Sequence, residues 1–229
     1  KKKKNTVKRK EWTLTEVVHL YDEACLKVER TKVATKKRRQ AENLRDLILL
    51  AAYTGARLSE IVKLEVKYIE KEEGVRFFHF ATDTRFQEVG KTAAATRKFP
   101  VHSDIEQLVD RLIVTTADGY LISGEETHNQ FNDRTTSIGK RFGVLKTQLG
   151  YQKQVEVFHS FKHALRSALA NNAADIEMGM QSEIIDYMCA HEGGSVGARV
   201  YQRYWKMKHL QRIVETLKYP WTSNLPPFL

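Results

Sequence analysis

The chain has 229 residues but only 2 cysteines, 4 prolines and no long apolar run. Two thiols, Cys25 and Cys189, cannot build a disulfide framework, which excludes a small disulfide scaffold and favours a reducing compartment. No apolar stretch approaches the ~18 residues that a membrane-spanning helix requires, so we expect no membrane partner. The N-terminal run KKKKNTVKRK lacks the apolar centre of a signal peptide.

Acidic residues are also in deficit. The 28 Asp and Glu residues face 38 Lys and Arg residues, which gives a formal net charge of +10 at pH 7. Such an excess favours a polyanion as partner, although a basic surface that only aids solubility would have the same composition. Hydrophobic residues make up 41% of the chain and charged residues 29%, as is typical of a single globular domain of this length.

Apolar periodicity predicts helices in the first part of the chain. Thr13 and Glu16 have the spacing of a capping box, and the apolar residues after them predict a helix that ends at about Arg30. The polar and basic stretch over residues 31–40 is interpreted as a loop or a frayed helix end. The next helix is expected to stop at Gly55, and another begins directly afterwards.

The middle of the chain changes period and then returns to helix. The segments VRFFHFA and TRKFPV are rich in β-branched and aromatic residues, which predicts a small antiparallel sheet over roughly residues 66–101 with a turn at Gly90. Further helices are predicted around Leu108, Phe142, Leu165, Ile185 and Ile213, the last of them ended by Pro220. The predicted fold class is therefore α+β, mainly α-helical, with one small sheet.

Three positions could carry chemistry, and each also has a purely structural interpretation. Arg57 follows Gly55 at a helix corner, where a guanidinium could bind phosphate or simply face solvent. His159 and His163 share one helix face, but HSFKH lacks the Glu of HExxH and shows no third ligand, so we expect no metal. Tyr201 follows the glycine-rich EGGSVGAR and needs cationic neighbours to act as a nucleophile; otherwise it is a packing residue.

Four segments, in this order, resemble the catalytic domain of the tyrosine recombinases, in particular the phage-integrase type. TGARLSEI resembles the first box, KTAAATRKFPVH the sheet motif, FHSFKHALRSAL the second box, and CAHEGGSVGARVYQRY the box that ends at the nucleophilic tyrosine. The likeness extends from about Thr13 to Tyr219 and implies the tyrosine recombinase catalytic-domain fold. It places the catalytic residues at Arg57, Lys91, His159, Lys162, His191 and Tyr201.

The chain departs from the family pattern in the second box. The family's usual H-x-x-R-H carries Lys162 in place of its arginine, and a lysine cannot grip a phosphate with two parallel hydrogen bonds. By analogy with a lost oxyanion donor, the rate would fall by about 10²–10³. Arg166 repeats the H-x-x-R spacing one turn later, Ala190 replaces the glycine of L-G-H, and Tyr204 is an alternative nucleophile to Tyr201.

The resemblance implies a mechanism without a metal or nucleotide cofactor. Tyr201 would attack the scissile phosphate to form a 3′-phosphotyrosyl bond, and Lys91 would protonate the departing 5′-oxygen. Arg57 and Lys162 would neutralise the non-bridging oxygens, while the two imidazoles donate hydrogen bonds and handle protons.

The resemblance also suggests how the domain meets its partners. We expect a basic interdomain linker over residues 1–10, the catalytic domain over 11–219 and a tail over 220–229, with no N-terminal core-binding domain in this fragment. The partner would be double-stranded DNA, bound by a homo-oligomer, expected to be a tetramer on two duplexes, in the prokaryotic cytoplasm or nucleoid or a host DNA compartment. Backbone contacts are expected from Lys2, Lys3, Lys4, Lys8, Lys37 and Arg38.

Other functions remain open at this point. A type IB topoisomerase or a hairpin telomere resolvase shares the proposed chemistry, and Lys162 favours a DNA-binding homologue with impaired catalysis. A generic RNA-binding or scaffold domain would explain the charge but not the ordered motifs.

Overall fold

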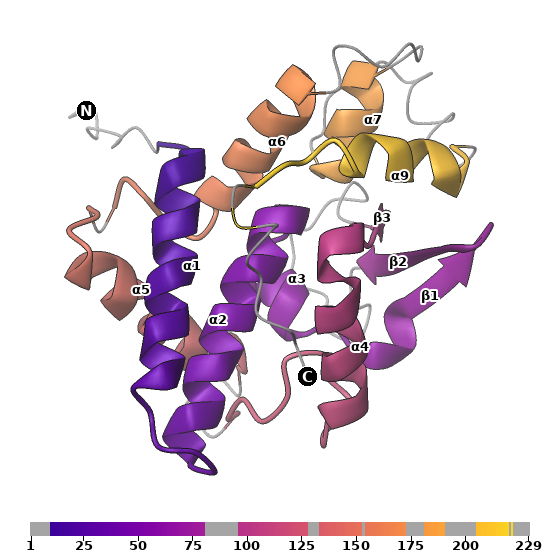
Figure 1. Cartoon of the computed structure of the whole chain (residues 1–229). Coiled ribbons are helices and arrows are strands. Elements are labelled where there is room, and N and C mark those ends of the chain that lie inside the picture. The colour runs from indigo at the N-terminus through magenta and orange to yellow at the C-terminus, as the bar shows by residue number, and fades with distance from the viewer. Residues whose placement is uncertain are drawn as a thin grey trace, which may run out of the picture.

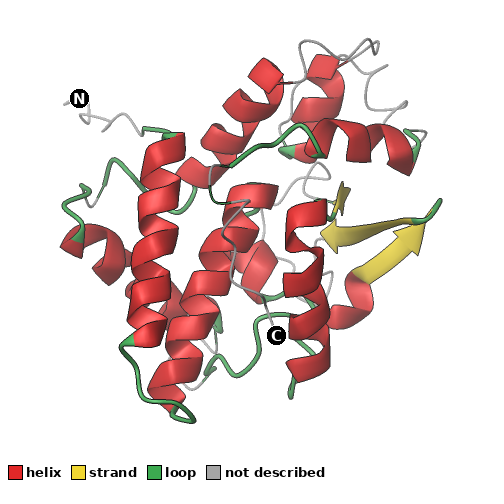
Figure 2. Ribbon diagram, in the orientation of Figure 1, coloured by secondary structure: helices red, strands yellow, loops and turns green. Residues whose placement is uncertain are grey.

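Helices dominate the computed structural model, which describes residues 10–80, 96–127, 133–152, 154–172, 181–190, 205–219 and 221 (Figures 1 and 2). A three-stranded antiparallel sheet completes the domain, so the prediction of a mainly helical α+β fold is confirmed. None of the helices in these ranges is long and apolar enough to cross a membrane. The α-helices are α1 (Leu14–Glu29), α2 (Lys36–Thr54), α3 (Leu58–Val62), α4 (Glu106–Thr115), α5 (Thr135–Gln148), α6 (Ser160–Asn172), α7 (Gln181–Met188) and α9 (Met207–Val214).

Helix α1 begins where its capping box predicts. The Thr13 hydroxyl accepts from the Glu16 backbone N–H at 3.2 Å, and the Glu16 carboxylate accepts from the Thr13 N–H at 2.8 Å. These two bonds satisfy donors that would otherwise lack partners at the helix start. One face of α1 is buried and packs along α2 (Figure 1).

Helix α2 begins earlier than predicted. Residues 36–40 are helical, so the expectation of a loop or frayed helix end there was wrong. The Thr35 hydroxyl accepts from the Arg38 N–H at 3.1 Å and caps the new helix. The Arg38 guanidinium donates to the carbonyl of Val28 at the end of α1 and to Glu42 Oε1 at 2.9 Å. These contacts stabilise the tight α1–α2 junction, which apolar periodicity could not reveal because the segment is polar.

The sheet and helix α9 form one packed unit. Strands β1 (Ile69–Glu72), β2 (Val75–Phe80) and β3 (Arg97–Pro100) pair in that order, each antiparallel to its neighbour. The apolar face of α9 packs against β2 and β3. This helix ends at Val214, so the prediction that it runs to Pro220 was wrong. The predicted turn at Gly90 lies outside the described residues.

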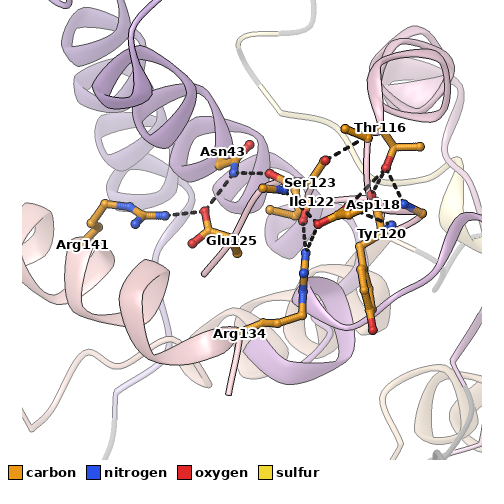
Figure 3. Close-up of polar contacts among 12 residues, drawn as sticks. Asn43, Thr116, Asp118, Tyr120, Ile122, Ser123, Glu125, Arg134 and Arg141 are labelled. Atoms are coloured by element: carbon orange, nitrogen blue, oxygen red, sulfur yellow. Dashed lines mark hydrogen bonds and ion pairs between the residues drawn. The ribbon is translucent and has the colours of Figure 1, made fainter. Parts of the chain in front are cut away.

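The described part of the connection between α4 and α5, residues 116–127 and 133–134, has little regular structure but a dense set of polar contacts (Figure 3). Asn43 of α2 donates to Glu125 Oε1 at 2.8 Å, and Arg141 of α5 pairs with the same carboxylate. Arg134 donates to Asp118 Oδ2 at 3.0 Å and to the Ile122 carbonyl at 2.9 Å. Because Glu125 is buried and bound on both sides, it holds α5 against α2.

The segment after α9 returns to the centre of the domain. Tyr219 and Trp221 stack with ring centroids 4.5 Å apart. The Tyr219 hydroxyl donates to the Ala52 carbonyl at 2.8 Å, and Trp221 Nε1 lies 3.4 Å from the Tyr53 hydroxyl. The chain up to Trp221 therefore packs on α2 of its own domain.

Candidate active site

Arg57 stands on a rigid corner between α2 and α3. Gly55 ends α2 with a φ of 56°, a left-handed conformation that glycine adopts without strain. A Cβ at this glycine would lie 2.8 Å from Leu165 Cδ2 and 3.1 Å from Lys162 Cα. Only glycine therefore lets the corner approach α6 so closely, which brings the first and second boxes together.

The Arg57 guanidinium is oriented by Glu60, one turn along α3. Arg57 Nη1 donates to Glu60 Oε1 at 2.8 Å, and the Arg57 backbone N–H donates to Oε2 at 2.7 Å. Side-chain exposure is 38% for Arg57 and 14% for Glu60. Arg57 is thus held from one side by its partner and presents the remainder of its guanidinium outward.

Lys162 comes to the same place from α6. Its side chain is buried, and its Nζ donates to the carbonyl of Ala190 at 3.1 Å. Burial lowers the pKa of Lys162, and the positive charge of Arg57 lowers this pKa further. Cys189 lies nearby, and burial raises the pKa of its thiol to about 11, so the thiol stays neutral and does not balance the ammonium at pH 7.

The chain before residues 191–204 is held by Lys162, and the chain after them packs on α7. Ala190 follows the end of α7 with a φ of 50°, an uncommon conformation for a residue with a Cβ, and holds Lys162 through its carbonyl. The described chain resumes at Trp205, whose ring packs edge-to-face on Tyr187 of α7 at 5.2 Å. The intervening residues include His191 and both tyrosines considered as nucleophiles.

His159 directly precedes α6, and its carbonyl accepts from the Lys162 N–H at 3.1 Å. Its ring lies edge-to-face with His163 at 5.2 Å. Arg166, the alternative to Lys162, instead donates through Nε and Nη2 to Asp186 on α7, at 3.0 and 2.8 Å. The contact of Lys162 with the corner of Arg57 therefore favours the register in which Lys162 occupies the second-box position.

Several predicted site residues lie outside the described ranges: Lys91, His191, Tyr201, Tyr204, Lys2, Lys3, Lys4 and Lys8. Of the two remaining candidates for DNA contact, Lys37 is exposed on the first turn of α2. Arg38 donates through Nε to Glu42 and through Nη1 to the carbonyls of Val28 and Thr31, so these two nitrogens are already bound within the domain. Both remain predictions.

Sequence reasoning missed two residues of the cluster, Glu60 and Arg97. Arg97 of β3 donates from Nη1 and Nη2 to the two oxygens of Glu60 at 3.2 and 3.0 Å. Burial alone would raise the pKa of Glu60, but Arg97 and Arg57 outweigh it and hold the pKa below its ordinary value. The R-x-x-E spacing of Arg57 and Glu60 was the available signal for this pair.

Comparisons with known proteins identify the domain. The sequence profile of the Phage integrase family matches residues 19–204, which contain all four boxes. Comparisons with curated proteins and with solved structures give no match. A profile match over most of the chain, together with the meeting of the first and second boxes at one corner, shows that this chain belongs to the phage integrase family and is a tyrosine recombinase catalytic domain.

Proposed function

We propose that this chain is a site-specific DNA recombinase that cleaves and rejoins DNA through a 3′-phosphotyrosyl bond to Tyr201. The observation that carries the proposal is the convergence of Arg57 and Lys162, two cations from separate boxes, beside the point where the chain enters residues 191–204. Cleavage of a phosphodiester builds negative charge on its non-bridging oxygens, and prearranged cations stabilise that charge without reorganisation.

The proposed reaction exchanges one phosphate ester for another. The phenol oxygen of Tyr201 bonds to phosphorus as the bond from phosphorus to the 5′-oxygen breaks. Lys91 gives its proton to that oxygen, and the imidazole of His159 or His191 takes the phenolic proton. Attack by the 5′-hydroxyl of a partner strand restores the phosphodiester and frees Tyr201, so resealing needs no nucleotide hydrolysis. We further propose double-stranded DNA as the substrate and a tetramer on two duplexes as the working assembly.

A second candidate is a DNA-binding homologue with impaired catalysis. It is favoured by Lys162, whose buried ammonium bonds to a backbone carbonyl and lacks the two-pronged donor face of arginine. A topoisomerase or telomere resolvase with the same chemistry stays a third possibility, to be judged by the products of the reaction.

The test is covalent capture from a pool of nicked duplexes of randomised sequence. Loss of the short 5′-hydroxyl fragment at the nick traps the protein on its DNA, and denaturing electrophoresis reveals the adduct. We expect the wild type to form an adduct that Tyr201→Phe does not form, and sequencing of the trapped DNA gives the preferred site. If neither the wild type nor Lys162→Arg forms an adduct, the enzyme function is wrong and the DNA-binding homologue is favoured.

A further inference from the structure

Arg97 lies at the junction of three segments that the proposed reaction needs in fixed positions. It belongs to β3, and its side chain is only 2% exposed. Its Nε donates to the carbonyl of Met188 at the end of α7 at 2.8 Å, and its two terminal nitrogens donate to Glu60 of α3. Its guanidinium also lies over the ring of Phe80, 4.6 Å from the centroid.

One branch of these contacts leads to Arg57. Glu60 Oε1 accepts from both Arg57 Nη1 and Arg97 Nη1, while Oε2 accepts from the Arg57 backbone N–H and Arg97 Nη2. Both oxygens of the carboxylate are thus shared between the two arginines. A shift of Glu60 would move the Arg57 guanidinium with it.

The other branch leads to Lys162. The Met188 carbonyl that Arg97 holds is two residues before Ala190, whose own carbonyl accepts from Lys162 Nζ. The position of the end of α7 therefore determines where the Lys162 ammonium is held and where the segment 191–204 begins.

We infer that Arg97 is a positioning residue that fixes Glu60 and the end of α7 together, and so keeps Arg57 and Lys162 aligned. The inference rests on the proposed function. Arg97 does not reach the DNA itself, because it is buried and its Nε and both terminal nitrogens donate to protein oxygens. Only arginine can make these divergent bonds at once, since a lysine at this position offers a single charged nitrogen.

The test compares Arg97→Lys in two backgrounds, by single-turnover cleavage of a nicked duplex recovered from the covalent capture. In the wild-type background we expect a loss of about 100-fold, the usual effect of misplacing a reacting group by an ångström. In an Arg57→Lys background the same change should cost clearly less, about 10-fold, because its effect through Arg57 is already lost while its effect on Lys162 through the end of α7 remains. Arg76→Lys, at a half-buried arginine of β2 paired with Asp110, is the matched control and should cleave as the wild type does.

The possible outcomes distinguish a failure of the role of Arg97 from a failure of the proposed recombinase function. An equal loss in both backgrounds, or wild-type cleavage by Arg97→Lys, overturns the role of Arg97 while leaving the recombinase intact. Absence of any adduct from the wild type overturns the proposed function and the inference with it. If Arg97→Lys does not fold, Glu60→Gln takes its place in the same two backgrounds: non-additivity with Arg57→Lys then supports the inferred chain of contacts, and additivity overturns it.

Discussion

The ammonium of Lys162 lies 3.1 Å from the carbonyl oxygen of Ala190, which joins the second box to the beginning of the segment that carries Tyr201. Lys162 belongs to α6 and Ala190 follows the end of α7, and their bond places a buried positive charge beside Arg57. Burying this charge costs folding free energy, because the carbonyl of Ala190 offsets only part of the desolvation of the ammonium.

Lys162→Met should separate the contribution of this charge to cleavage from its effect on the stability of the fold. Removing the ammonium is expected to lower single-turnover cleavage by about 10²-fold or more, since a transition-state donor is lost. The stability of the fold should be unchanged or higher, because methionine fills similar volume without a buried charge. Lys162→Arg is the opposite control and should raise cleavage above the wild-type rate. Wild-type cleavage by Lys162→Met would contradict a catalytic role for this residue.

The pH dependence should differ between lysine and arginine at this position. Burial and the charge of Arg57 lower the pKa of Lys162 from 10.5, so cleavage by the wild type should fall at a lower pH than cleavage by Lys162→Arg. Stability has the opposite trend: between the folded pKa and 10.5 the unfolded chain binds more protons, so folding becomes more favourable as pH rises. Rate profiles of the wild type and Lys162→Arg check the first sign, and denaturant titrations of the wild type and Lys162→Met check the second. Superimposable profiles would show that Lys162 does not titrate in this range.

Ala190→Gly should stabilise the protein. Ala190 has a φ of 50°, a conformation that costs a residue with a Cβ about 1–2 kcal/mol more than glycine, part of which is returned as chain entropy. We expect a net gain of about 1 kcal/mol in the free energy of unfolding. Ala168→Gly, inside α6, is the control and should lose about 1 kcal/mol. A loss of stability in both variants would contradict the prediction and show that Ala190 does not hold a strained left-handed conformation in solution.

Gly55→Ala tests the close approach of the first and second boxes. The new Cβ would meet Leu165 at 2.8 Å in a left-handed backbone, so we expect a loss of roughly 2 kcal/mol in stability and weaker cleavage. Gly143, in α5, has a helical backbone and open space around its missing Cβ. Gly143→Ala should therefore gain about 1 kcal/mol. Thermal unfolding of the pair checks both signs, and a neutral Gly55→Ala would show that the corner can retreat from α6.

Lys91→Ala addresses the proposed general acid. With an ordinary phosphodiester we expect cleavage to fall by about 10²–10⁴-fold, the usual contribution of a positioned acid. A substrate with sulfur at the bridging 5′ position should restore the rate, because a thiolate leaves without a proton. If the sulfur substrate is equally slow, another residue supplies the proton.

The elements that the sequence predicts well are those whose signals are local. The capping box of Thr13 and Glu16 and the helix stop at Gly55 depend on neighbours within one turn, and both are confirmed. The start of α2 was missed because Thr35 and Arg38 form a polar junction that has no apolar repeat. The end of α9 was misplaced because Leu217 is buried by the return of the chain rather than by helix packing.

The candidate site shows the same division. The family pattern predicts Arg57 and Lys162 as site residues, and the structure places their segments in contact. It did not identify Arg97 as their common support, because that role depends on a carbonyl at Met188 and a carboxylate at Glu60 that are distant in the chain. A contact to a backbone carbonyl distant in the chain does not depend on the residue type there, so only coordinates reveal it.

The stacking of Tyr219 on Trp221 limits how far this domain can be shortened for laboratory work. Cutting the chain after Val214 would remove both rings and the Leu217 carbonyl that His102 contacts at 3.2 Å, opening the top of α2 to water. A shortened version of the domain should therefore keep Trp221, and a C-terminal purification tag should follow this residue.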